Sequence, residues 1–259
     1  MFNHLIYEIK EGICTITLNR PDVYNALNPA LIQEITRAFL QAGTDSSVRV
    51  VVLTGMGDKA FCSGADLKSG INGATSLGDS LRKGYNPMIL SIRNLAKPVI
   101  GRLNGIAAGA GCSLALACDV IIASDTARMS QIFVSIGLII DAGSSYFLPR
   151  LLGSQKAFEL ASTGRIVEAH ECLALGLVSQ VVPHDKLDLA VHQTAEMYAK
   201  SATQAIGLIK KILNQSHRST LEQMLELEAV NQDIAGQTHD FVEGVSAFLS
   251  KKLPNFRGI

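Results

Sequence analysis

The sequence predicts an α/β fold in which a sheet-bearing core is followed by a helical C-terminal region. The N-terminal segment has the order strand, strand, helix, strand, and its last strand, Val48 to Gly55, is a run of mainly β-branched residues. Short apolar runs recur up to Ser124, whereas helical periodicity dominates from Gly143 onward. Strands first and helices last indicate a core that carries the sheet and a helical region that follows it.

The first elements are a predicted hairpin and an amphipathic helix. The runs LIYEIK and ICTITLN alternate apolar and polar residues, and Glu11-Gly12 separates them. Asn28-Pro29 predicts a helix start, and we expect that helix to reach about residue 41 with one apolar face. The strand Val48 to Gly55 lacks alternation, so we expect both of its faces to be covered.

The elements after Gly55 repeat the order of strand, turn and helix. The loop GMGDKAFCSGADLKSG carries a small-residue turn at Gly64-Ala65-Asp66. Residues 69–80 are rich in Gly, Ser and Asn and are predicted to be mobile, and a helix is expected from Leu81 to Leu95. KPVIGRLNG and DVIIAS then predict two further strands that enter turns.

Composition and charge exclude several classes of protein. The 259 residues are 47% hydrophobic and carry 23 acidic and 23 basic side chains, which describes a globular chain without the basic surplus of a nucleic-acid-binding protein. The five cysteines lack CxxC spacing, and the six histidines lack metal-ligand spacing, so we expect buried thiols and no metal site. No apolar segment approaches the ~20 residues of a membrane span, and the N-terminus does not resemble a signal peptide. We expect a cytoplasmic protein that binds no membrane.

The stretch from Asn104 to Ser145 is the strongest candidate for a functional site. It begins with glycines interleaved with alanines, and a short apolar helix is expected to start near Ala110. A helix start with little side-chain cover can offer N–H groups to an oxyanion, but small residues also let a buried helix pack closely on a sheet. One carboxylate, Asp141, follows among apolar residues. It could serve as an acid/base or as the N-cap of the next helix.

Several separated motifs resemble the crotonase (enoyl-CoA hydratase/isomerase) superfamily over nearly the whole chain. They are NRPDVYNAL, KAFCSGADL, KPVIGRLNGIAAGAGCSLALACDVIIAS, IGLIIDAGSSYFLPRLLG, GLVSQVVP and GVSAFLSKKLPNF. The resemblance implies a spiral of repeated β-β-α units over residues 1–195. It also implies a C-terminal helical region over residues 196–259 that forms a homotrimer or a dimer of trimers.

The resemblance also implies the substrate and its contacts. Substrates of the superfamily are acyl-CoA thioesters, and no separate cofactor is expected because CoA is part of the substrate. A thioester enolate would be held by the backbone N–H groups of Ala65 and Ala110. The positions that match CoA contacts are Asn25, Ala26, Leu27, the turn from Ser63 through Asp66 to Leu67, and, in a neighbouring subunit, Phe248 and Lys251. Arg20 could contact a phosphate or could be structural.

The expected reaction follows from which acids this chain has. Hydratases of the family use two glutamates, at the positions that here are Ser113 and Phe133, and we expect these two residues to contact the substrate. Instead, Asp141 in GLIIDAG resembles the aspartate of the 1,2-epoxyphenylacetyl-CoA isomerase branch, although Ile140 stands where proline is common and Ser144 where glycine is. Apolar neighbours should raise the pKa of Asp141, which suits a group that takes and returns a proton.

We therefore expect an acyl-CoA isomerase that acts on a ring epoxide or on a Δ3-enoyl chain. One alternative is an enoyl-CoA hydratase whose water is held by Asp141 and a hydroxyl such as that of Ser113. A second alternative is a catalytically inactive CoA-binding subunit, which the loss of both hydratase glutamates would allow.

Overall fold

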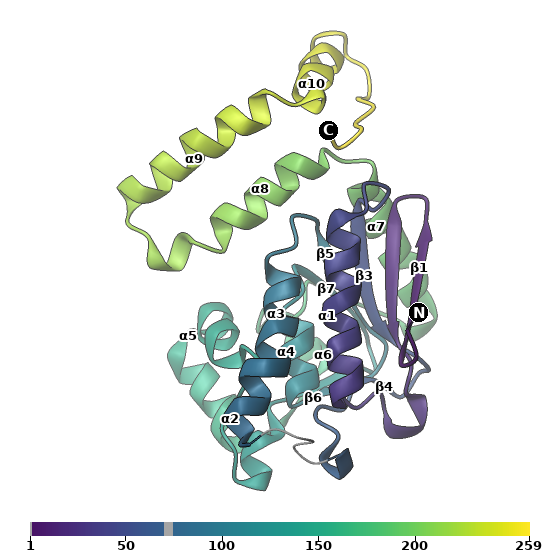
Figure 1. The fold of residues 1–259 in the computed structure, drawn as a ribbon, viewed down its shortest axis with the longest axis vertical. Helices are drawn as coiled ribbons and strands as arrows, with labels where there is room; N and C mark the ends of the chain where they lie inside the picture. The colour runs from purple at the N-terminus through teal and green to yellow at the C-terminus, as the bar shows by residue number, and fades with distance from the viewer. Residues whose placement is uncertain (1, 70–74) are drawn as a thin grey trace.

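A computed structural model gives the structure of residues 2–69 and 75–259 (Figure 1). Residues 70–74 belong to the segment that the sequence predicts to be mobile, and they lie outside the described residues. The strands are β1 (Leu5–Lys10), β2 (Ile13–Leu18), β3 (Val50–Gly55), β4 (Ala60–Cys62), β5 (Val99–Leu103), β6 (Ile106–Ala108), β7 (Val120–Ser124), β8 (Arg128–Ser130), β9 (Ile166–Glu168) and β10 (Gln180–Val182).

The helices follow the predicted order, with most of them after residue 143. They are α1 (Pro29–Thr44), α2 (Leu77–Ser80), α3 (Asn86–Arg93), α4 (Ala110–Leu116), α5 (Ser144–Thr163), α6 (Ala169–Ala174), α7 (Leu187–Ala199), α8 (Thr203–Leu213), α9 (Leu221–Gly236) and α10 (His239–Leu249). Short 3-10 helices are η1 (Pro21–Val23), η2 (Leu67–Ser69), η4 (Ile132–Ile136), η5 (His184–Lys186) and η6 (Ser216–Arg218), and η3 (Leu81–Tyr85) is a π-helix.

Two sheets form the spiral that the resemblance implied. The six-stranded sheet has the order β1-β2-β3-β5-β7-β10, and the four-stranded sheet has the order β4-β6-β8-β9. β1 and β2 form the predicted antiparallel hairpin, and β2, β3, β5, β7 and β10 are parallel. From β3 to β8, successive strands alternate between the large and the small sheet, with helices between the pairs. This repeated winding confirms the predicted α/β spiral.

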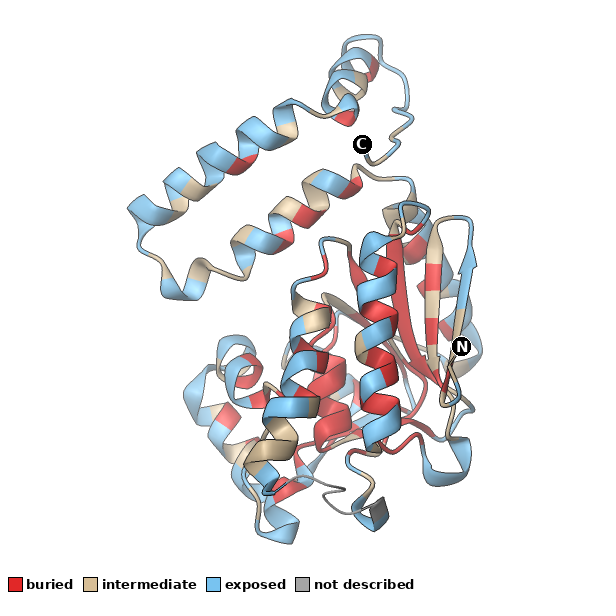
Figure 2. Ribbon diagram, viewed as in Figure 1, coloured by how far each residue is buried: buried red, intermediate tan, exposed pale blue. Residues whose placement is uncertain are grey.

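The large sheet is covered on both faces, as its β-branched strand predicts. Val51 and Leu53 belong to the main core beneath α1, whereas Val50 and Val52 pack with residues of α7 on the opposite face. The side chain of Asn28 accepts a hydrogen bond from the Leu31 N–H at 2.8 Å and caps α1 at the predicted position. Figure 2 shows that buried residues concentrate in β3, β5, α1 and α4.

The segment predicted as one helix from Leu81 to Leu95 is a longer composite. It begins at α2, continues through η3 and ends with α3 at Arg93. Pro87 lies in the first turn of α3 and has no N–H, so it cannot form the regular helical hydrogen bond to the preceding turn. The π-turn of η3 accommodates this position, and it places Tyr85 in the interior.

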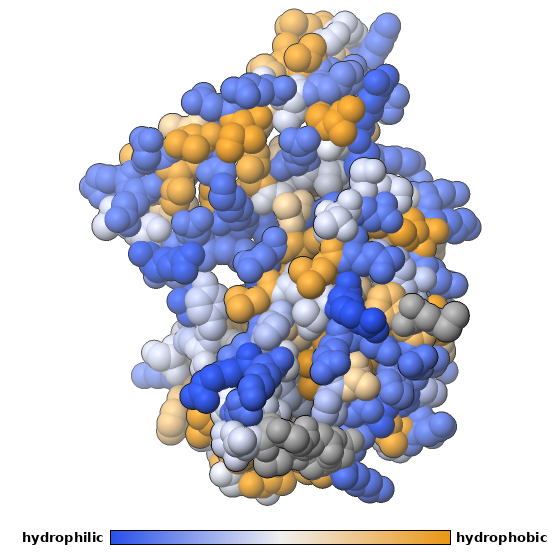
Figure 3. Space-filling view, viewed as in Figure 1, coloured by the Kyte–Doolittle hydropathy of each residue, from blue (hydrophilic) through white to orange (hydrophobic). Residues whose placement is uncertain are grey.

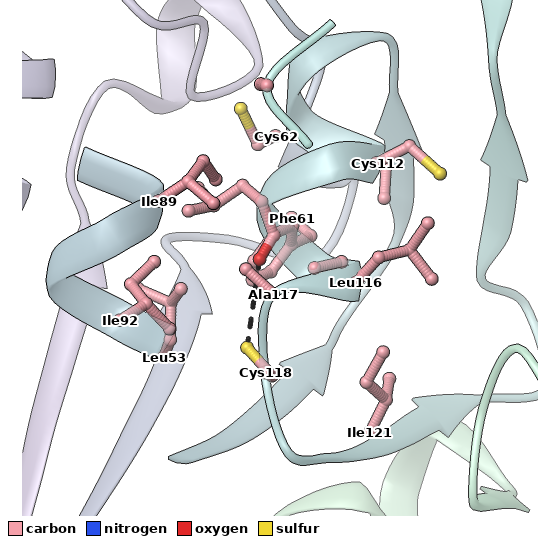
Figure 4. Close-up of a cluster of buried hydrophobic side chains, with 14 of the residues drawn as sticks. Leu53, Phe61, Cys62, Ile89, Ile92, Cys112, Leu116, Ala117, Cys118 and Ile121 are labelled. Carbon is pink, nitrogen blue, oxygen red and sulfur yellow. Dashed lines mark hydrogen bonds between the residues drawn. The ribbon is translucent and has the colours of Figure 1, made fainter. Parts of the chain in front are cut away.

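Residues of the helices α3 and α4 belong to the same core cluster. Figure 4 shows Ile89 and Ile92 of α3 on one side of this cluster, and Leu116 of α4 and the following Ala117 near Phe61. All five cysteines are buried and free, which confirms their interpretation as buried thiols. In the described part of the chain, no helix is long and apolar enough to cross a membrane.

The last three helices form an arm beside the core (Figure 1). α8 and α9 contact each other, and Figure 2 shows most of α9 and α10 exposed. The predicted boundary at residue 195 falls within α7, whose Leu187, Val191 and Ala195 pack on the sheet. The division into a 1–195 core and a 196–259 helical region stays a prediction.

Candidate active site

A cavity of about 780 Å³ lies where three irregular segments meet: the loop after β4, the helical segment α2–η3, and the segment from η4 to the start of α5. Its wall is mainly apolar. Of the site residues predicted from the sequence, the following line it: Leu27, Ser63, Ala65, Asp66, Leu67, Ala110, Phe133 and Asp141. The structure therefore brings together the predicted acid/base and both predicted N–H donors.

The two predicted N–H donors follow glycines whose backbone has positive φ. Gly64 has a φ of +98°, and Gly109 has a φ of +51°. A Cβ atom built on Gly64 would lie 2.8 Å from the Ala108 carbonyl oxygen and 3.5 Å from the Ala110 nitrogen, so the two loops are in close contact. Such backbone conformations and such an approach favour glycine.

Both donor groups are available to a ligand. Two backbone hydrogen bonds hold the loop that contains Ala65. The Leu27 N–H donates to the Gly64 carbonyl oxygen at 2.8 Å, and the Asp66 N–H donates to the Leu27 carbonyl oxygen at 2.9 Å. Within the described residues, the N–H groups of Ala65 and Ala110 have no hydrogen-bond partner. Two unpaired donors on adjacent loops at one cavity wall can bind an oxyanion.

Asp141 is a half-buried carboxyl group without a protein partner. Its Oδ1 is buried and forms no hydrogen bond with the residues that the structure describes. Burial raises its pKa from 3.8 to about 6. The alternative role as an N-cap is wrong, because α5 has Gly143 at its N-cap and no side chain accepts a hydrogen bond there. The carboxyl group is therefore available to exchange a proton with a ligand.

Two buried serines donate hydrogen bonds to the backbone carbonyl oxygen of Asp141. The Ser113 hydroxyl donates to the Asp141 carbonyl oxygen at 3.0 Å, and the Ser144 N–H donates to the same oxygen at 3.0 Å. The two hydroxyls are 2.7 Å apart. Ser113 is fully buried and does not line the cavity. Its position suits the support of Asp141 better than direct contact with a substrate.

Arg20 and Asn25 brace the loop that was predicted to contact CoA. Arg20 donates to the Ala26 carbonyl oxygen at 2.6 Å and forms an ion pair with Asp66 at 2.9 Å, which favours its structural interpretation. The amide of Asn25 is fully buried and donates to the carbonyl oxygen of Ala60 at 2.9 Å. Asp66 also accepts from the Lys68 N–H at 3.2 Å, so this carboxylate bonds its own turn.

Two predicted CoA contacts lie far from the cavity within this chain. Phe248 is on α10, and Lys251 follows it; both are exposed. Figure 1 shows α10 at the opposite end of the molecule from α2, which borders the cavity. Within one subunit these residues therefore do not join the site.

Tyr85, for which the sequence predicted no role, also lines the cavity. This side chain is only 9% exposed, and burial and then the charge of Asp141 raise its pKa. In the sequence, Tyr85 is marked only by the Asn86-Pro87 pair that follows it, and its burial depends on the π-turn of η3.

Comparison with known proteins identifies the family. The family model for enoyl-CoA hydratase/isomerase matches residues 8–258. The chain belongs to this family. It is 37% identical to a 1,2-epoxyphenylacetyl-CoA isomerase of Escherichia coli strain K12 over the full length of both chains. It is 40% identical to a probable enoyl-CoA hydratase of Rhodobacter capsulatus over 99% of each chain.

A solved member of the enoyl-CoA hydratase/isomerase family has the same fold. The crystal structure of an enoyl-CoA hydratase from Bacillus anthracis has a TM-score of 0.94 and 33% sequence identity, and the match covers 99% of this chain and 100% of that chain. The relatives carry the names of both isomerases and hydratases, so the residues at this chain's own site must distinguish the two reactions.

Proposed function

We propose that this protein is an acyl-CoA isomerase that forms a thioester enolate and moves one proton with Asp141. The observation that carries the proposal is the carboxyl group of Asp141, which has no hydrogen-bond partner among the described residues and lines the same apolar cavity as two unpaired N–H donors. Asp66, the other carboxylate of the described cavity wall, is paired with Arg20. Substrates of the proposed reaction are a Δ3-enoyl chain or a ring epoxide, joined to CoA.

The N–H groups of Ala65 and Ala110 would receive the thioester oxygen. As a base removes a proton from the carbon next to the thioester, negative charge moves onto this oxygen. Preorganised backbone donors stabilise that charge without reorientation, and one such donor typically contributes about 10²–10³ in rate. The enolate would therefore form next to Asp141.

Asp141 would act first as a base and then as an acid. Its carboxylate takes the proton from C2 of a 3-enoyl thioester, and the electrons move into a dienolate. The carboxylic acid then returns the proton to C4, which leaves the double bond between C2 and C3 and regenerates the carboxylate. A pKa of about 6 leaves most of the group ionised at neutral pH while keeping its acid form accessible.

Enoyl-CoA hydration is the second candidate, and relatives named as hydratases favour it. Hydration needs a positioned water, and the predicted partner for that water was Ser113. The hydroxyl of Ser113 is buried and donates to the Asp141 carbonyl oxygen, and Phe133 lines the cavity, so the described part of the site offers Asp141 without a second catalytic carboxylate. The geometry therefore favours proton transfer over hydration.

We also propose that CoA enters as part of the substrate, with no separate cofactor, and that the chain forms a homotrimer or a dimer of trimers. Apolar side chains are exposed on α10, including Val242 at 65%, Phe248 at 83% and Leu249 at 76%. Figure 3 shows apolar patches on the C-terminal arm. A subunit interface would cover such a surface and could bring Phe248 and Lys251 to the CoA of a neighbouring subunit.

Incubation with cis-3-enoyl-CoA in deuterated buffer tests the proposed reaction. We expect the 2-enoyl product, with little 3-hydroxyacyl-CoA, from the wild type and from an Asp185→Asn control at an exposed site. Asp141→Asn should lower the rate by about 10²–10⁴-fold, the usual contribution of a general acid/base. Dominant 3-hydroxyacyl-CoA would favour the hydratase, and an unaffected variant would remove Asp141 from the mechanism.

A further inference from the structure

Tyr85 carries a polar group that the proposed proton transfer does not use. The residue is 9% exposed and lines the same cavity as Asp141. Among the residues that the structure describes, none forms a hydrogen bond with its hydroxyl. The hydroxyl is not one of the fully enclosed unpaired polar atoms, so it reaches the cavity surface.

The Tyr85 side chain is mostly buried, but its hydroxyl is accessible from the cavity, so water can pair with it while the cavity holds no ligand. Tyrosine side chains that are buried usually place their hydroxyl against a hydrogen-bond partner. At Tyr85 the protein supplies none, and the surrounding cavity wall is mainly the apolar side chains of residues such as Ile32, Leu81, Phe133 and Ile140. A ligand that fills the cavity displaces this water, and the hydroxyl is then left unpaired unless the ligand itself carries an acceptor.

The charge of the cavity restricts what that group can be. Its described wall contains Asp66 and Asp141 and no Lys, Arg or His. An acyl group that ended in a carboxylate would meet the charge of Asp141 without a compensating cation. An uncharged oxygen can accept from Tyr85 without this repulsion.

We propose that Tyr85 is a specificity residue whose hydroxyl donates a hydrogen bond to an uncharged oxygen carried by the acyl group. The site then selects neutral, oxygen-bearing acyl-CoA thioesters, such as a ring epoxide or an ether, over hydrocarbon or carboxylate-ended ones. This inference rests on the proposed acyl-CoA site, but it concerns binding rather than proton transfer.

A matched pair of unreactive ligands tests the role of Tyr85. 2-Methoxyphenylacetyl-CoA and 2-ethylphenylacetyl-CoA have similar shapes, and only the first offers an ether oxygen. By calorimetry, the wild type should bind the methoxy ligand about 5-fold more tightly, the usual effect of one neutral hydrogen bond. Tyr85→Phe should remove this preference and bind the ethyl ligand as the wild type does.

Tyr7→Phe is the matched control. The Tyr7 hydroxyl forms no hydrogen bond with the described residues either, but Tyr7 lies on β1 outside the cavity, so this variant should keep the methoxy preference. Equal weakening of both ligands by Tyr85→Phe, or an unchanged preference, would overturn the inference. Adipyl-CoA should also bind more weakly than hexanoyl-CoA, and equal binding would contradict the selection against carboxylates.

These binding results are separable from the proposed isomerisation. Loss of the methoxy preference in Tyr85→Phe would support the inference even if the wild type moved no double bond. Conversely, isomerisation that depends on Asp141, together with no methoxy preference, would leave the proposed reaction intact and refute the role of Tyr85.

Discussion

Asp141→Asn should stabilise the folded protein at neutral pH while it reduces catalysis. Burial raises the pKa of Asp141 from 3.8 to about 6, so ionisation of this group opposes folding. The difference corresponds to about 3 kcal/mol at pH values above both pKa values. Because the side chain is only half-buried and solvent screens part of this cost, we expect a gain of about 1–2 kcal/mol.

The pH dependence of this gain has a definite sign. Below pH 3.8 the carboxyl group is protonated in the folded and unfolded states, and the ionisation cost is absent. Between pH 3.8 and about 6 the folded state binds more protons than the unfolded state, so the cost grows as pH rises. Above about pH 6 it is constant. The stability difference between the variant and the wild type should follow this course.

Urea unfolding at a fixed protein concentration measures the effect. The excess stability of Asp141→Asn over the wild type should grow by about 1 kcal/mol between pH 5 and pH 8. Asp185→Asn, at an exposed position, should show no such growth. A variant that is equally stable or less stable than the wild type at both pH values would refute the conclusion that burial raises the pKa of Asp141.

Three further variants test the surroundings of the carboxyl group. Gly109→Ala should lower kcat by about 10²-fold, because φ of +51° is unfavourable for alanine and the Ala110 N–H would turn away from the substrate oxygen. The control is Gly176→Ala, where φ is +77° and no atom of the described residues lies near the added Cβ. This control should lose about 1 kcal/mol of stability and keep its kcat. Ser113→Ala removes a hydrogen bond to the carbonyl oxygen of Asp141. It should lower kcat a few-fold, which steady-state kinetics measures, and the free energy of unfolding by about 1–2 kcal/mol, which denaturation measures. Phe133→Ala should admit water and shift the acid limb of the pH–rate profile below about 6, and an unmoved limb would contradict the role of this ring.

Local signals in the sequence were sufficient to predict the main strands, the first helix and the two loops at the cavity. The β-branched run at β3 predicted a strand buried on both faces, and its residues do alternate between the α1 and α7 sides. Asn28 marked the start of α1 because its side chain caps the helix. Small residues around Gly64 and Gly109 located the two loops that meet at the cavity. Each of these features depends on residues close together in the chain.

The supporting contacts of the site could not be predicted because they join distant segments. Ser113 lies 28 residues before the carbonyl that it holds, and its buried position depends on how α4 packs against α5. The burial of Tyr85 depends on the π-turn before Pro87. The three-residue strands β9 and β10 are too short to show alternation, and they form only where a neighbouring strand is present.

The contacts predicted for the C-terminal residues depend on assembly. Phe248 and Lys251 lie on the arm and away from the cavity of their own chain. The exposed apolar residues of α10 indicate a surface that another subunit can cover, and sedimentation measures the number of subunits. A monomer at micromolar concentration would contradict the proposed trimer.

The most direct test of the central claim is the pH dependence of kcat/KM for isomerisation of a 3-enoyl-CoA. If Asp141 is the base, activity must rise with pH as its carboxyl group ionises and must reach a plateau above the pKa. We predict one acid limb with an apparent pKa of about 6, absent from the residual activity of Asp141→Asn. A flat profile between pH 5 and pH 8, or the same limb in the variant, would contradict the assignment of Asp141 as the group that moves the proton.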